Sequence, residues 1–102
     1  MIDLLKLVLG EDNPDIIRKE FFSLTTEFER NIEKGMHENN VGLATKLRGL
    51  LKNNVKLKRS DKVRLLKIIN RAKVRALMTG TDDGDRIFRN LDSIGGDILR
   101  LM

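Results

Sequence analysis

Apolar residues recur at the three- and four-residue spacing of an α-helix over most of this chain. Between residues 14 and 34 the first stripe consists of Ile17, Phe21, Leu24, Phe28 and Ile32. Residues with this spacing share one helical face, because one turn takes about 3.6 residues. Asn13 and Pro14 suit the start of such a helix, and Gly35 suits its end. We therefore expect a long amphipathic helix over residues 14–34.

The second stripe predicts a shorter helix over about residues 40–53. Polar residues 38–40 separate it from the first helix, and either Asn39 or Asn40 can cap its first turn with a side-chain oxygen. Its inward positions are Leu43, Ala44, Leu47, Leu50 and Leu51. We expect this helix to run antiparallel to the first.

The third stripe, over residues 61–78, combines the densest apolar pattern of the chain with its densest positive charge. Ser60 and Asp61 suit the first turn of this helix, and Gly80 suits its end. One face carries Leu65, Ile69, Ala72 and Ala76, and this face is widened by Val63, Leu66, Val74 and Leu77. So wide an apolar surface needs neighbours on at least two sides. We therefore expect the 61–78 helix to pack between the 14–34 and 40–53 helices.

Shorter helical segments are expected at both ends. Residues 3–9 suit a short amphipathic helix, which is marginal alone because of its length. Residues 79–85 indicate a turn and a helix cap, followed by a helical piece with Ile87, Phe88 and Leu91. Residues 93–96 contain two glycines and are expected to interrupt this piece, leaving one more turn over residues 97–102.

These segments together predict an all-α fold, a small antiparallel bundle of three main helices with short flanking helices. A length of 102 residues suits a single domain over 1–102. The absence of Trp and Tyr, together with a single Pro, favours helices over a β-sandwich. The core is expected to contain Phe21, Leu24, Phe28, Leu47, Leu51, Leu65, Ile69 and Ala72.

Positive charge is concentrated in the middle of the chain. Residues 36–78 hold 12 basic and 2 acidic side chains, whereas residues 1–35 hold 5 and 8, and residues 79–102 hold 3 and 5. Such a block suggests a nucleic acid or an acidic protein as partner, unless the acidic ends fold back and neutralise it. The candidate binding residues are Lys56, Lys58, Arg59, Arg64, Lys67, Arg71 and Arg75. The last four form a basic strip on the 61–78 helix.

No pattern in the sequence indicates catalysis or metal binding. The glycine-containing stretches 79–85 and 93–96 lack the lysine of phosphate-binding loops. Asp82, Asp83 and Asp85 lack the alternating spacing of a calcium loop, and His37 has no second His or Cys as a fellow ligand. We expect a non-enzyme that uses no cofactor and no metal.

The cysteine content and the N-terminal residues bear on cellular location. The sequence contains no cysteine, and its N-terminal apolar run is short and includes Asp3. These features argue against a disulfide framework, a signal peptide and a membrane span. We expect a soluble, cytoplasmic protein that does not associate with membranes.

Residues 33–51, Glu-Lys-Gly-Met-His-Glu-Asn-Asn-Val-Gly-Leu-Ala-Thr-Lys-Leu-Arg-Gly-Leu-Leu, resemble a domain of known proteins. Over roughly residues 14–53 the chain is similar to the small N-terminal helical domain of some bacterial AAA-family ATPases, which is comparable to the three-helix microtubule-interacting and trafficking (MIT) domain. Residues 90–96, Asn-Leu-Asp-Ser-Ile-Gly-Gly, also resemble the opening of such an ATPase module. The resemblance implies a non-catalytic domain for recognition or assembly.

Two functions from different classes are compatible with these features. The first is a protein-interaction or assembly domain that takes a partner helix in a groove between its own helices. The alternative is a small basic nucleic-acid-binding protein without strong sequence preference, because the basic block lacks aromatic side chains and has few amides to read bases. A protein partner is the preferred expectation, and a homo-oligomer is compatible with it.

Overall fold

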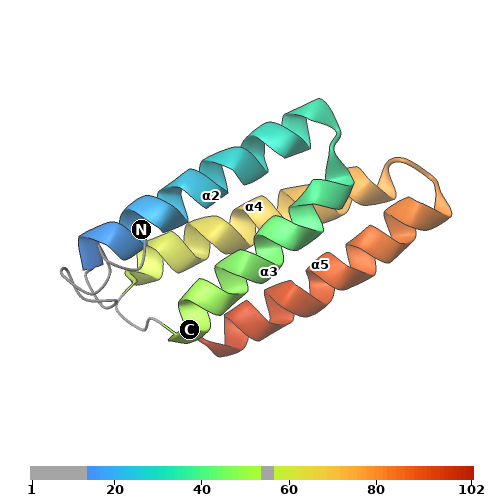
Figure 1. Ribbon diagram of the computed structural model, residues 1–102. Coiled ribbons are helices and arrows are strands. Elements are labelled where there is room, and N and C mark those ends of the chain that lie inside the picture. The colour runs from blue at the N-terminus through green and yellow to red at the C-terminus, as the bar shows by residue number, and fades with distance from the viewer. Residues whose placement is uncertain (1–13, 54–56) are drawn as a thin grey trace.

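The computed structural model describes residues 14–53 and 57–102, which form the four α-helices drawn in Figure 1. Helix α2 spans Pro14–Lys34, α3 spans His37–Asn53, α4 spans Arg59–Leu77 and α5 spans Asp82–Arg100. These described residues contain no strand, so the expected all-α fold is confirmed. The short helix expected over residues 3–9 and the cap expected at Asn13 lie outside the described residues.

The helices form two antiparallel hairpins, α2–α3 and α4–α5, which pack side by side (Figure 1). As a result α2 runs parallel to α4, and α3 runs parallel to α5. Helix α4 contacts α5 most extensively and α2 next, whereas α2 and α5 do not touch. The expected position of α4 between α2 and α3 is therefore corrected. Its principal neighbour is α5, and it touches α3 only slightly.

The apolar stripes of all four helices meet in one core. Seven of the eight expected core residues are buried, and Leu24 is partly buried at the edge of the core. Phe28, Leu47, Leu65 and Ile69 are completely inaccessible to solvent. Helix α5 adds a stripe that was not expected to extend so far, consisting of Ile87, Leu91, Ile94 and Ile98.

Helix α5 is continuous for 19 residues, so the interruption expected at residues 93–96 is wrong. Glycine weakens a helix interior by about 1 kcal/mol relative to alanine, which motivated that expectation. Ile94 and Ile98 lie on either side of Gly95 and Gly96 and are buried, with exposed fractions of 5% and 0%. Burying such side chains contributes roughly 1.5–3 kcal/mol each, which outweighs the two glycines.

The helix starts differ from the sequence expectations at two places. The N-cap residue of α4 is Lys58, which makes no side-chain capping hydrogen bond, so Ser60 lies inside the helix and is not its cap. Helix α3 begins at His37, so neither Asn39 nor Asn40 caps it. The early start of α3 follows from the short turn after α2. The hydrogen bond from the Met36 amide to the Asn31 carbonyl closes this turn at Met36, so α3 begins directly after it.

Both hairpin turns use a glycine in the left-handed conformation, as expected. Gly35 has φ of 72° and Gly80 has φ of 65°. After α2, the Gly35 amide donates to the Ile32 carbonyl and the Met36 amide donates to the Asn31 carbonyl, which is the Schellman arrangement. After α4, Thr81 caps α5 through its hydroxyl, which accepts a hydrogen bond from the Gly84 amide at 3.0 Å.

Candidate interaction surface

One surface of α4 faces away from the other described helices. Lys67, Arg71, Val74 and Met78 are spaced at four, three and four residues, so they share one side of the helix, opposite the buried stripe that contains Leu65. Arg75 and Leu77 flank this side. We call these six residues the outer face of α4. It is basic toward the middle of the helix and apolar toward the helix end.

The apolar part of the outer face is exposed to solvent. The exposed fractions are 57% for Val74, 44% for Leu77 and 74% for Met78. Val74 and Leu77 were expected to widen the buried surface of this helix, and that expectation is wrong. These positions lie far round the helix from Leu65, and the described neighbours of α4 pack against its other sides.

Acidic residues from both ends of the chain neutralise part of the basic block. Arg64 Nη2 lies 2.7 Å from Glu29 Oε1 of α2. On the other side, Lys73 Nζ lies 2.8 Å from Asp92 Oδ1 and Arg48 Nη1 lies 2.9 Å from Asp97 Oδ2, both on α5. These pairs are partly exposed, so each contributes little to stability.

Within residues 14–53 and 57–102, the cations of the outer face form no ion pair. Lys67, Arg71 and Arg75 are all exposed. Neutralisation of the basic strip by acids of the first long helix would use Asp15, Glu20, Glu27 or Glu33, but the last three pair with none of these cations, and the Asp15 side chain lies outside the described ones. The positive charge of this face therefore remains available to a ligand.

Arg64 does not belong to this free charge. Besides its pair with Glu29, its guanidinium lies 5.3 Å from the centre of the Phe22 ring, a cation–π contact. Phe22 itself is 60% exposed and lies off the buried stripe of α2, as its position in the sequence indicates.

The remaining candidate residues lie near the start of α4. Lys58 precedes the helix and Arg59 is its first residue, and both are exposed. Arg59 is eight residues before Lys67, which corresponds to about 12 Å along the helix axis. Lys56 lies outside the described residues. The seven candidates therefore do not form one strip. Three lie on the outer face, Lys58 and Arg59 lie at the opposite end of α4, Arg64 is paired with Glu29, and Lys56 is not described.

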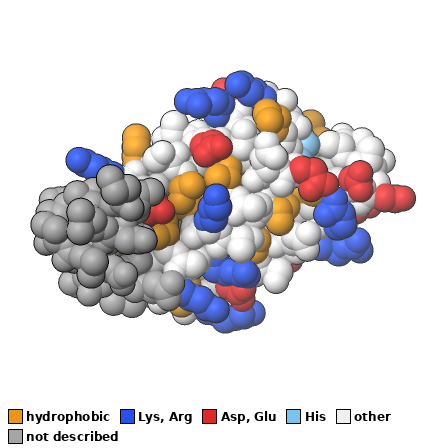
Figure 2. Space-filling view, viewed as in Figure 1, with side chains coloured by type: hydrophobic (Ala, Val, Ile, Leu, Met, Phe, Trp, Pro, Cys, Tyr) orange, Lys and Arg blue, Asp and Glu red, His pale blue; other side chains and the backbone are white. Residues whose placement is uncertain are grey.

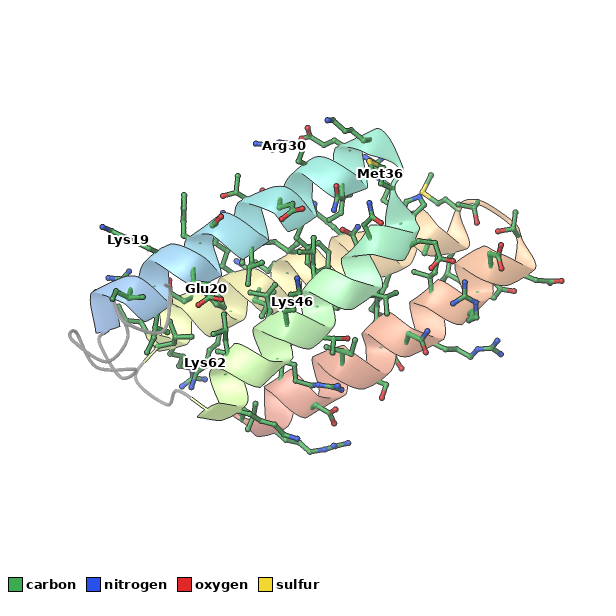
Figure 3. The ribbon with its side chains drawn as sticks, viewed as in Figure 1. Lys19, Glu20, Arg30, Met36, Lys46 and Lys62 are labelled. Carbon is green, nitrogen blue, oxygen red and sulfur yellow. The ribbon has the colours of Figure 1, made fainter. Side chains whose placement is uncertain are left out.

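Other surfaces of the molecule mix charges of both signs. In Figure 2 acidic side chains gather at the end where α5 begins, where its first turn carries Asp82, Asp83 and Asp85. Carboxylates at this position interact favourably with the positive end of the helix dipole. In Figure 3 Glu20 of α2 and Lys46 of α3 project on the same side, where they border a shallow groove with Leu24 and Gly49.

The described residues contain no group of three or more His, Cys, Asp and Glu that could hold a metal ion. His37 starts α3 and is half-buried, and its Nδ1 has no hydrogen-bond partner. Among the described helices, none has the length and apolar character needed to cross a membrane. Comparison with protein-family models, with curated proteins and with solved structures finds no match to this chain.

Proposed function

We propose that this chain is a non-catalytic helical interaction domain that binds an acidic protein segment through the outer face of α4. The observation that carries the proposal is the combination on one helix side of unpaired cations, Lys67, Arg71 and Arg75, with exposed apolar side chains, Val74, Leu77 and Met78. Large apolar side chains next to each other on a protein surface are typical of sites for a protein partner.

The chemistry of the partner follows from this surface. Carboxylates of the partner neutralise the cations and steer its approach, and its apolar side chains cover Val74 and Met78. An amphipathic helix with acidic residues beside its apolar stripe meets both requirements and fits recognition along a helix face. The resemblance of residues 33–51 and 90–96 to AAA-family ATPases supports a place for this domain in recognition or assembly for such an ATPase.

Nucleic acid is the second candidate, and the same unpaired cations favour it. Phosphate contacts need only a basic surface and have no use for apolar side chains. The two functions therefore differ in the role of Val74 and Met78. Replacing these two residues with serine leaves the charge unchanged. It should therefore weaken binding of a protein segment but not binding of nucleic acid.

A binding titration with three variants tests the proposal. The probes are a fluorescent 18-residue helical peptide with a leucine stripe flanked by glutamates, and a fluorescent 20-base-pair duplex. The variants are Lys67→Gln/Arg71→Gln/Arg75→Gln, Val74→Ser/Met78→Ser, and a control of equal charge, Lys19→Gln/Lys46→Gln/Arg89→Gln, whose residues are exposed on the other three helices. Anisotropy is measured at low and at physiological salt.

We expect micromolar binding of the peptide, at least tenfold weaker for both outer-face variants and unchanged for the control. Duplex binding that is strongly salt-dependent, is lost in the charge variant and is unaffected by Val74→Ser/Met78→Ser would establish the second candidate instead. Absence of peptide binding at about 100 μM, or binding that the outer-face variants do not weaken, would overturn the proposal.

A further inference from the structure

A groove of about 440 Å³ runs between α4 and α5, and none of the six residues of the outer face of α4 lines it. Leu66 and Asn70 of α4 form one wall, and Gly95 and Gly96 of α5 form the other. Leu99 stands at its edge with 62% of its surface exposed. The groove can therefore receive an apolar side chain, and the exposed Leu99 is a side chain that can enter a groove of this kind on another molecule.

The charges along this edge of α5 are symmetric about Gly96. Asp92, Gly96 and Arg100 are spaced four residues apart and lie along one side of the helix. The Asp92 side chain is 61% exposed and the Arg100 side chain is 78% exposed. Asp92 and Arg100 each lie about 6 Å from Gly96 along the helix axis. A second α5 that runs antiparallel and crosses at Gly96 would therefore carry its own two charges at the same distances, in the opposite order.

The occupant that this pattern fits is a second copy of the chain. When the second copy is reversed about Gly96, its Arg100 faces Asp92, and its Asp92 faces Arg100. Two ion pairs then form across a two-fold axis, as in the isologous interface of a symmetric dimer. Lys73 and Asp97 already contact these two charged groups at 2.8 Å and 2.9 Å, so each new pair extends an existing network.

The packing around Gly96 leaves space for such an approach. A Cβ atom on Gly96 would have no heavy atom within 4 Å, and a Cβ atom on Gly95 would lie 3.5 Å from Ile69 Cγ2, an ordinary contact. Neither glycine is therefore required by the packing within one chain, although glycine weakens a helix interior relative to alanine. In the antiparallel arrangement the missing side chain lets the two α5 helices approach, and each Leu99 reaches the groove of the other copy.

We propose that the chain forms a two-fold symmetric dimer in which α5 helices cross antiparallel at Gly96 and the α4–α5 groove of each copy receives Leu99 of the other. This interface goes beyond the proposed function, because it is made by α5 and the α4–α5 groove and uses none of the six residues of the outer face of α4. The dimer would present two such faces, one from each copy.

Sedimentation equilibrium of the full chain from about 1 to 500 μM tests this dimer. Gly96→Gln introduces a good helix former where a Cβ atom meets no described heavy atom within 4 Å, so it should weaken dimerisation at least tenfold without destabilising the monomer. Asp92→Arg and Arg100→Asp should each abolish the dimer, because each places like charges opposite one another. Lys19→Glu, a charge reversal at an exposed residue of α2, which does not contact α5, is the control and should dimerise normally.

The decisive measurement mixes the two charge variants. An equimolar mixture of Asp92→Arg and Arg100→Asp should form a mixed dimer, because both cross-axis pairs become attractive again. A wild-type chain that stays monomeric up to 500 μM would overturn the proposal. So would a dimer that Gly96→Gln leaves intact, or variants that fail to associate when mixed.

Discussion

The two hairpin turns of this molecule each contain one glycine in the left-handed conformation, but their polar side chains differ in hydrogen bonding. At the α4–α5 turn the Thr79 hydroxyl donates to the Ala76 carbonyl at 2.8 Å and lies 2.9 Å from the Thr81 hydroxyl. Thr81 in turn accepts from the Gly84 amide. Short-range hydrogen bonds therefore connect the end of α4 to the start of α5.

The α2–α3 turn instead buries amide side chains without partners. Asn40 is completely buried, and neither its Oδ1 nor its Nδ2 has a hydrogen-bond partner among the residues that the structure describes. Asn31, on the facing end of α2, is 6% exposed and its Nδ2 is also unpartnered. An unpartnered polar group in the interior costs about 1–3 kcal/mol. The α4–α5 turn is therefore held by side-chain as well as backbone hydrogen bonds, whereas the α2–α3 turn has only its Schellman backbone bonds and lies beside two buried amides that lower stability.

Both hairpins contribute to the one core, so core truncation in each hairpin is the reference for the comparison. Phe28→Ala in the first hairpin and Ile69→Ala in the second each remove a completely buried side chain. Each should lower the free energy of unfolding by about 3–4 kcal/mol, through lost burial and the cavity left behind. Urea unfolding followed by circular dichroism measures this, and a loss below about 1 kcal/mol at either site would show that the hairpin concerned is not packed as described.

Glycine substitutions should have opposite signs in the two hairpins. A Cβ atom on Gly84 would lie 2.1 Å from Thr79 Oγ1 and 2.3 Å from the Ala76 carbonyl oxygen, whereas one on Gly42 of α3 meets nothing within 4 Å. Gly84→Ala should therefore destabilise the protein by about 2–3 kcal/mol, because a backbone atom cannot move aside cheaply. Gly42→Ala should stabilise it by about 0.5–1 kcal/mol through helix propensity. Thermal unfolding of both variants decides, and equal effects would contradict the close contact at Gly84.

Replacing the buried Asn40 with leucine, which branches at the same carbon, should sharpen the contrast further. Asn40→Leu removes two unpartnered polar atoms and should raise the free energy of unfolding by about 1 kcal/mol. The matched control is Thr25→Val, because Thr25 is equally buried but its hydroxyl donates to the Phe22 carbonyl at 2.9 Å. That variant should lose about 0.5–1 kcal/mol. If Asn40→Leu also loses stability, the Asn40 amide has a favourable role at this turn.

Most of the fold could be predicted from the sequence because three helices carry regular apolar stripes, although the expected start signals of α3 and α4 were wrong. Pro14 and Gly35 mark the ends of α2 in the sequence, and the structure places that helix at Pro14–Lys34. Helix α5 was underestimated because Gly95 and Gly96 indicate a break locally. Only the burial of Ile94 and Ile98 against α4 and α3, a tertiary effect, overrides that signal.

The candidate surface was predicted only in part. The charge pattern in the sequence pointed to Lys67, Arg71 and Arg75, and these residues are exposed together. Spacing on one helix could not show that Glu29 neutralises Arg64, since that depends on the parallel alignment of α2 and α4. It also could not show that Val74 and Leu77 stay exposed, because this depends on which sides of α4 the neighbouring helices occupy.

The pairing of the helices into two hairpins has a consequence for how the chain folds. Within each hairpin the partner helices are joined by a short turn, so little entropy is lost when they meet. The contacts between α2 and α4, and between α3 and α5, join segments much farther apart along the chain. We therefore expect each hairpin to form early and the docking of one hairpin on the other to limit the folding rate. A substitution that stabilises one turn should speed folding if its hairpin is already formed when docking occurs. It should slow unfolding instead if that hairpin forms only afterwards.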